Sequence, residues 1–184
     1  MPGLDALVAT EIARRPSIFR DGAFHADTWS FPDDGAPLPP SGAVAVGKAR
    51  FLAESQTLRA RNGAIGVVLN PGDDLDGVAE HLDRLTLVAL RFTKYSDGRP
   101  YSVARLLRDR HGYKGELRAI GDVLRDQIVF LMRAGFDALD VTHAGTREAL
   151  RAGAIVGVHH HYQPASAEDR EARASISPWR RSSR

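Results

Sequence analysis

The chain has 184 residues, of which 43% are hydrophobic and 26% are charged, and it contains no cysteine. This length suits one domain with a substantial core, and the composition is typical of globular proteins. No run of about eighteen apolar residues is present, so we expect no membrane span. The absence of cysteine excludes disulfides and thiol nucleophiles.

The formal net charge of +2 lies entirely in the C-terminal tail. Five arginines and three acidic residues follow Ala165, so residues 1–164 are formally neutral. Nucleic-acid-binding domains usually carry a basic face on their folded part, and we therefore expect no nucleic-acid partner. The N-terminus lacks a basic segment followed by an apolar one, which predicts no secretory signal and a cytoplasmic protein.

A β-hairpin is predicted near the N-terminus. Ser17–Ala23 and Phe24–Phe31 are the candidate strands, and Asp21-Gly22 supplies the residues of a tight turn. The proline-rich segment Pro32–Ser41 then predicts a linker. We expect three parts: an N-terminal extension (1–41) with hairpin and linker, an α/β domain (42–163), and a flexible basic tail (164–184).

Apolar strands and amphipathic helices alternate after the linker. The predicted strands are Ala43–Val46, Ile65–Leu69, Leu87–Phe92, Glu116–Ile120, Ala138–Val141 and Ile155–His161. The predicted helices lie near Ala49–Ala60, Leu75–Leu82, Ser102–Arg110, Asp122–Ala134 and Thr146–Arg151. The strands show no clear alternation of apolar and polar residues, which favours a single α/β domain with a mainly parallel sheet covered by helices. Periodicity leaves two forms of this sheet open, an open three-layer sheet and part of a barrel, and we favour the open one.

The carboxyl ends of the strands are the expected ligand-binding edge of such a sheet. The loop after Leu87–Phe92 carries Lys94, Asp97 and Arg99. Arg99 is placed at the start of a predicted helix, where backbone N–H groups favour an anion and a guanidinium adds bidentate recognition. An ion pair between Arg99 and Asp97 is the alternative interpretation.

The helix predicted after this loop is rich in arginine. Ser102 is placed as its N-cap. Arg105 and Arg108 lie opposite its apolar side, and a solvated face is the simpler interpretation, especially for Arg108. Arg105 is kept as a candidate ligand-binding residue.

The strand that follows places Glu116 and Arg118 on one face. A buried, unpaired guanidinium is very costly, so Arg118 needs a carboxylate, and Glu116 is its nearest partner on that face. The alternatives for Arg118 are a structural ion pair and an anion-binding side chain that reaches the edge of the sheet.

The next predicted helix begins with polar residues. Asp122 is placed as its N-cap, and Asp126 projects toward one side, so both are candidate catalytic carboxylates. Gln127 falls within the apolar side of the helix, where a buried amide needs hydrogen-bonding partners. We expect Gln127 to bond to the backbone or to a ligand.

Two further patterns lack a required residue. Gly42–Ala49 has the glycine and lysine spacing of a phosphate-binding loop, but Ala49 stands where a magnesium-binding hydroxyl belongs. His159 and His161 share one face of their predicted strand, whereas zinc needs three or four ligands. We therefore predict neither nucleotide hydrolysis nor a metal site.

Three segments closely resemble the bacterial family known as domain of unknown function 934: DGRPYSVARLLRDR, GYKGELRAIGDVLRDQ and RAGFDAL. The resemblance extends over roughly Trp29 to Gln163. It implies a role close to sulfur assimilation, because members are commonly labelled oxidoreductases and tend to be encoded beside assimilatory sulfite or nitrite reductase genes. The family's signature corresponds here to Asp97, Gly98, Arg99, Ser102, Arg105, Leu107, Arg108, Gly115, Glu116, Arg118, Gly121, Asp122, Asp126 and Gln127.

The chain departs from many relatives at one position. Relatives often have a cysteine just before a Gly-Phe-Asp sequence, and this chain has Ala134 there. A redox role for that thiol is therefore not general to the family.

Two hypotheses remain open. In the first, the protein is an oxidoreductase or accessory protein of assimilatory sulfite reduction that binds a small anion or a cofactor through Arg99, Arg118 and Arg105 at the edge of the sheet. Asp122 or Asp126 would then accept a proton or orient an arginine, and the sequence names no cofactor. In the second, it is a non-catalytic binding or assembly partner of sulfite reductase that docks through the arginine-rich helix. If the three arginines converge on one site, the ligand-binding hypothesis is favoured. If they are dispersed over the surface, the docking hypothesis is favoured.

Overall fold

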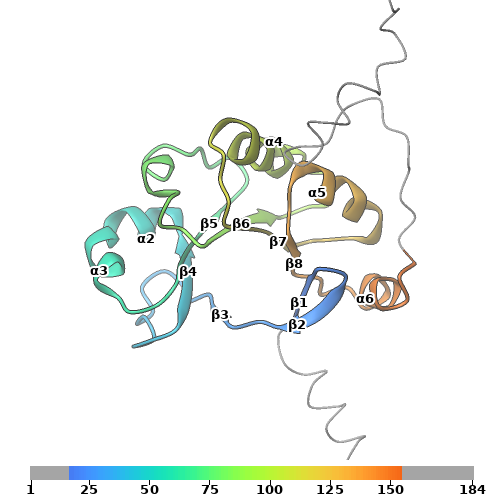
Figure 1. Ribbon diagram of the computed structural model, residues 1–184, viewed down its shortest axis with the longest axis horizontal. Coiled ribbons are helices and arrows are strands. Elements are labelled where there is room, and N and C mark those ends of the chain that lie inside the picture. The colour runs from blue at the N-terminus through green and yellow to red at the C-terminus, as the bar shows by residue number, and fades with distance from the viewer. Residues whose placement is uncertain (1–16, 155–184) are drawn as a thin grey trace, which may run out of the picture.

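The computed structural model describes residues 17–154, which form one eight-stranded sheet with helices packed against it (Figure 1). The strand order is β2-β1-β8-β7-β6-β5-β4-β3. Strands β3 to β8 run parallel to one another, whereas β1 is antiparallel to both β2 and β8. The strand bounds are β1 Ser17–Arg20, β2 Ala23–Ala26, β3 Trp29–Ser30, β4 Ala43–Gly47, β5 Ile65–Leu69, β6 Leu87–Phe92, β7 Glu116–Gly121 and β8 Ala138–Leu139.

The sheet is curled, because consecutive strands form its two edges. β2 and β3 lie at opposite ends of the strand order, yet only Asp27 and Thr28 connect them. Eight flat strands would hold their outer edges about 34 Å apart at the usual spacing, whereas so short a connection spans roughly 10 Å. The edges therefore approach each other, and the segment from β2 to β3 passes below the parallel strands on their concave side (Figure 1).

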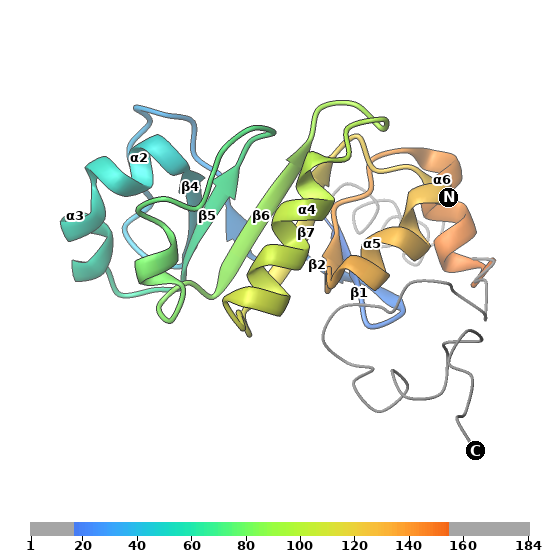
Figure 2. The same ribbon diagram turned by 90° about the horizontal axis from the view of Figure 1, so that it is seen from above.

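The described helices cover the convex face (Figures 1 and 2). They are α2 Lys48–Ala53, α3 Ser55–Ala60, α4 Arg99–Arg105, α5 Ile128–Ala134 and α6 Ala144–Arg151, with the shorter 3₁₀ turns η1 Ala79–His81 and η3 Arg125–Gln127 and the π-helical turn η2 Leu106–Arg110.

Two apolar clusters follow from the pleat of the strands. Alternate residues such as Val88, Leu90 and Phe92 face the helices and belong to the larger cluster. Their neighbours face the concave side, where Ala45, Val68, Leu87, Ala89 and Ile120 form a smaller cluster against Trp29.

The predicted class, an α/β domain with a mainly parallel sheet and an N-terminal hairpin, is confirmed. Of the two forms that the periodicity left open, the sheet adopts the curled one, with its helices on a single face. The open three-layer form does not occur because the segment from β2 to β3 occupies the face that a second helical layer would need.

The hairpin strands are integral to the sheet. β1 pairs with β8 and β3 pairs with β4, so the strands of the expected extension complete both edges of the parallel core. The expected single strand Phe24–Phe31 is instead split, since Asp27 and Thr28 separate β2 from β3. The strand expected at Ile155–His161 and the tail 164–184 lie outside the described residues.

The helices differ from expectation mainly where they begin and end. The segment Ala49–Ala60 forms two helices that meet at Glu54. Only one 3₁₀ turn forms within Leu75–Leu82. Within residues 17–154 no helix combines the length and the apolar character needed to cross a bilayer.

Candidate functional site

A buried ion network occupies the concave face. Arg118 of β7 is only 1% exposed. Its Nε donates to Oε1 of Glu116 at 2.7 Å, and its Nη1 donates to Oδ2 of Asp27 at 2.8 Å. The other oxygen of Glu116 accepts from Nη1 of Arg20 on β1 at 3.1 Å. The two carboxylates satisfy the guanidinium, which is the condition for burying such a charge.

This network resolves the two interpretations of Arg118. Glu116 is its partner, as the strand pleat predicts, and Asp27 from the β2–β3 connection is a second partner. Phe31 covers the guanidinium carbon at 5.7 Å from the ring centroid. With these groups around it, Arg118 ties β7 to the N-terminal segment, and the geometry favours the structural ion pair.

Asp140 lies beside this network, directly after β8. It is half-buried, and within residues 17–154 its carboxylate has no hydrogen bond or ion pair. Burial raises the pKa of Asp140 above its ordinary value, the negative charge of Asp27 raises it further, and the charges of Arg118 and Arg147 oppose the shift. A half-buried carboxyl with a raised pKa at the carboxyl end of a strand is a candidate acid or base.

Arg147 of α6 is held by other partners. Its Nη1 donates to the carbonyl of Val141 at 2.8 Å, and its Nη2 donates to the hydroxyl of Ser17 at 2.6 Å. Its guanidinium carbon also lies 4.4 Å from the ring centroid of Phe24. Arg147 therefore fastens α6 to the sheet and influences Asp140 only through its charge.

The strand register aligns Asp140 with an unpaired arginine. Arg91 of β6 is level with Ile120 of β7, and Asp140 continues the same row beyond β8. Asn70, which follows β5, extends the row on the other side of Arg91. Arg91 is exposed and forms no hydrogen bond or ion pair within the part of the chain that the structure describes. Arg91 and Asp140 are two strands apart, about 10 Å, and Ile120 lies level with both between them. The cation and the half-buried acid therefore flank an apolar residue on the same face of the sheet.

The loop after β6 holds the predicted residues Lys94, Asp97 and Arg99. Asp97 accepts from Nε and Nη2 of Arg99 at 2.9 and 2.7 Å. These hydrogen bonds lower the pKa of Asp97 and raise the pKa of Arg99. The crevice beside Arg99 encloses about 10 Å³, room for one water at most. Lys94 is exposed and joins this loop through its carbonyl, which accepts from the backbone of Asp97.

Ser102 and Arg105 lie on α4, in the outer helical layer. The expected N-cap at Ser102 is wrong, because the helix begins at Arg99 with Pro100 in its first turn, a position that suits proline's fixed φ. Ser102 is exposed and Arg105 half-exposed. Arg99 and Arg105 are thus on the convex side and Arg118 on the concave side, so the three arginines do not converge.

Arg108 corrects a second expectation about this arginine-rich segment. It was predicted to be solvated, but its side chain is 9% exposed. Its Nε donates to the carbonyl of Gly135 at 2.9 Å, its Nη1 donates to that of Tyr113 at 2.6 Å, and its Nη2 pairs with Asp137. The π-helical turn carries this side chain back toward the sheet, so Arg108 fastens the helical layer to the start of β7.

Asp122, Asp126 and Gln127 follow β7, but no regular helix begins at Asp122. The first turn is the 3₁₀ segment η3, so the expected N-cap is wrong. Oδ2 of Asp122 instead accepts from the backbone N–H of Tyr95 at 3.0 Å and ties the two loops together. Asp126 is exposed. These carboxylates do not face Arg118.

Gln127 makes the backbone contacts that its buried position predicts. Its Oε1 accepts from the N–H of Leu124 at 2.9 Å, and its Nε2 donates to the carbonyl of Tyr95 at 2.8 Å. It also contacts the hydroxyl of Tyr101, whose pKa burial raises to about 12. Gln127 therefore organises the loop after β6 as a structural residue.

Three residues of the concave face were missed by sequence reasoning. The sequence predicts Asp27 within the continuous strand Phe24–Phe31 and Asp140 in the interior of the strand Ala138–Val141. Arg91 carried a usable signal, since it is the only charged residue in the apolar segment LVALRF. Asp140 carried a weaker signal of the same kind, as an acid within an otherwise apolar predicted strand.

The comparisons with known proteins bear on this part of the chain. A family model described as "Bacterial protein of unknown function (DUF934)" matches residues 66–172, more than half of the 184 residues. The match includes Arg91, Arg118 and Asp140 and leaves out Asp27. No curated protein matches the chain. The chain therefore belongs to the DUF934 family of bacterial proteins.

Proposed function

We propose that the protein binds a small oxyanion at the carboxyl-terminal edge of its concave face and acts in assimilatory sulfite reduction, as an oxidoreductase or an accessory protein. The binding site is inferred from one observation: the unpaired Arg91 and the half-buried Asp140 lie at the same level of the sheet, two strands apart, on the concave face. The proposal keeps the small anionic ligand expected from the sequence and moves its site from Arg99 and Arg118 to Arg91. The pathway rests on the family resemblance.

The chemistry of the two side chains suits sulfite or sulfate. A guanidinium binds two oxygens of such an ion with two parallel hydrogen bonds. Asp140, whose pKa burial raises, keeps its proton to a higher pH than an ordinary aspartate and can donate it to a bound oxygen. Because the sequence has no cysteine, the electrons for any reduction must come from a bound cofactor or from a partner.

The test is a titration of the full chain with sulfite and with sulfate at constant ionic strength, read by calorimetry and by thermal midpoint. A real ligand raises the midpoint by mass action. Arg91→Gln should weaken binding by about tenfold or more, as expected for a lost charged hydrogen bond. Arg99→Gln is the matched control and should leave binding unchanged. The proposal fails if neither anion binds the wild-type chain, or if Arg91→Gln binds as tightly as wild type.

A second candidate function is a non-catalytic partner of sulfite reductase. Arg99, Arg105 and Arg118 are dispersed over two faces of the sheet, and dispersed arginines favour docking over the binding of one small ligand. Large hydrophobic side chains are also exposed: Tyr95 is 61% exposed and Phe130 of α5 is 60% exposed, and a partner that covers them would remove apolar surface from water. Co-elution with the reductase that is lost in Phe130→Ser and kept in Arg91→Gln would support docking through α5. Failure of the wild-type chain to co-elute with the reductase would contradict docking.

A further inference from the structure

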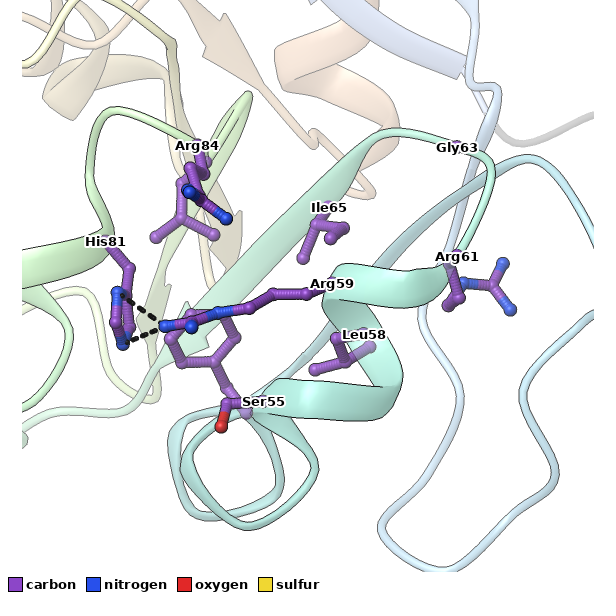
Figure 3. A pocket seen from close by; sticks show the side chains of 10 residues that line it. Ser55, Leu58, Arg59, Arg61, Gly63, Ile65, His81 and Arg84 are labelled. Carbon is purple, nitrogen blue, oxygen red and sulfur yellow. Dashed lines mark hydrogen bonds between the residues drawn. The ribbon is translucent and has the colours of Figure 1, made fainter.

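A cavity lies at the opposite end of the parallel strands from Arg91 and Asp140, on the convex side (Figure 3). It encloses about 240 Å³. Its walls come from α2, α3, η1 and the start of β5, so it shares no residue with the concave site.

The cavity is rich in cationic side chains without counter-charges. Arg59 of α3 extends across it toward His81 of η1, and its Nη2 lies 3.3 and 3.2 Å from the two ring nitrogens (Figure 3). Arg84 reaches over the same opening (Figure 3). Among residues 17–154 no carboxylate lines the cavity, and neither arginine has an acidic partner in that part of the chain.

Arg61 lines the cavity but has a different role. Its guanidinium points away from Arg59 and Arg84 (Figure 3) and donates to the carbonyls of Pro39 and Gly42. This contact fastens the proline-rich linker to the end of α3. The cationic side of the cavity therefore consists of Arg59 and Arg84, with the His81 ring beside Arg59.

The floor of the cavity is apolar. Phe51, Leu58 and Leu85 are buried there, and the Phe51 ring packs edge-on against His81 with ring centroids 5.8 Å apart. A ligand that fills the cavity must place an apolar group on this floor while its charge faces the arginines. An inorganic anion alone would leave the floor uncovered.

We propose that this cavity is a binding site for an organic phosphate or sulfate monoester with an aromatic group. Two guanidinium groups suit the several oxygens of a tetrahedral ester anion better than the two oxygens of a carboxylate. The aromatic group would pack on Phe51 and the leucines, and the hydroxyl of Ser55 at the cavity wall adds a further hydrogen-bonding group. The site is independent of the one proposed on the concave face.

The experiment is calorimetric titration of the full chain with phenyl phosphate and phenyl sulfate, with inorganic phosphate as the probe that lacks the ring. One or both esters should bind more tightly than inorganic phosphate. Arg59→Gln and Arg84→Gln should each weaken ester binding by about tenfold or more. Arg99→Gln, which changes an exposed arginine outside both sites, should have no effect. Both cavity arginines are exposed, so these variants should unfold at the wild-type temperature.

Each outcome decides the proposal. Preference for phosphate over sulfate, or the reverse, identifies the ester that the site takes. The proposal is overturned if neither ester binds at millimolar concentration, if both cavity variants bind as wild type does, or if inorganic phosphate binds as tightly as the esters. Loss of binding in Arg91→Gln with retention in Arg59→Gln would place the ester in the concave site instead.

Discussion

Arg118 shows how a single residue can be essential to the fold while lying at the centre of a charged cluster. It is 1% exposed and joins two carboxylates, so its removal would leave Glu116 and Asp27 without their shared counter-charge. We expect Arg118→Ala to lower the free energy of unfolding by about 3–5 kcal/mol, measured by urea denaturation. Arg99→Ala, which breaks an exposed pair with Asp97, should change stability little. Equal effects of the two variants would contradict the buried network.

Asp140 leads to a prediction about pH. Its pKa is raised by burial and by Asp27, so the folded protein holds this proton more tightly than the unfolded chain does. The resulting stabilisation is present below the ordinary pKa of 3.8 and is lost as the pH rises through the raised pKa of the folded state. At neutral pH the ionised carboxylate therefore destabilises the fold, a pattern that is common at functional sites.

Replacement of Asp140 tests this directly. Asp140→Asn should be more stable than wild type at neutral pH, and its advantage should shrink as the pH falls below the raised pKa. Urea denaturation at a series of pH values measures the difference. The exposed Asp126→Asn is the matched control and should show no such trend. If Asp140→Asn instead destabilises the protein at neutral pH, the carboxylate is a favourable structural group and the proposed acid is lost.

At the scale of elements, Gly66 determines how closely β3 can approach the parallel strands. A Cβ at this position would lie 2.9 Å from the Cβ of Leu87 and 3.0 Å from the Trp29 ring. We expect Gly66→Ala to displace Trp29 and to lower stability by about 1–3 kcal/mol, the usual cost of overpacking a core.

Tryptophan fluorescence reports this displacement. The chain has two tryptophans, so the measurement is made in a Trp179→Phe background, where the signal comes from Trp29 alone. A red shift of the emission in Gly66→Ala is expected as Trp29 becomes exposed to water. Gly98→Ala, where an added Cβ meets nothing within 4 Å, should leave the emission unchanged. An unshifted spectrum in Gly66→Ala would show that β3 does not pack on Gly66.

The elements also show what local sequence can and cannot predict here. The strand Leu87–Phe92 matches its predicted bounds, because a continuous apolar segment has few other stable environments. The starts of helices were less predictable. Ser102 and Asp122 have the side chains of N-caps, but Pro100 sets the start of α4 three residues earlier than expected, and Asp122 caps no helix because it accepts from Tyr95.

The candidate site was less predictable than the strands for a related reason. The pairing of Arg118 with Glu116 follows from strand pleat alone, and it was predicted. The role of Asp27 depends on the curl of the sheet, which brings residues 91 positions apart in the sequence into contact. Arg91 and Asp140 align only through the register of three strands. Neither the hydrophobic periodicity of the sequence nor a short motif specifies which residues of different strands lie side by side.

At the scale of the whole molecule, the N-terminal strands complete the fold. β1 covers the edge of β8, β3 covers the edge of β4, and Asp27 between them neutralises Arg118. Deletion of residues 1–31 would expose both edges of the parallel sheet, which are ready sites for pairing with other chains. The same deletion would leave Arg118 with one carboxylate in a buried position.

We therefore expect the chain that begins at residue 32 to lose cooperative unfolding and to aggregate, measured by urea denaturation and size-exclusion chromatography. Asp27→Asn in the full chain is the control. It weakens the ion pair with Arg118 and leaves the N-terminal strands in place, so it distinguishes the effect of the ion pair from the effect of losing the strands. It removes only one contact of Arg118, so it should fold, with a lower free energy of unfolding by roughly 1–3 kcal/mol. If the shortened chain instead remains monomeric and unfolds in one cooperative transition, residues 17–31 are an appendage and the parallel strands suffice for the fold. The two variants together thus distinguish a curled sheet that needs both of its edges closed from a parallel core that is stable by itself.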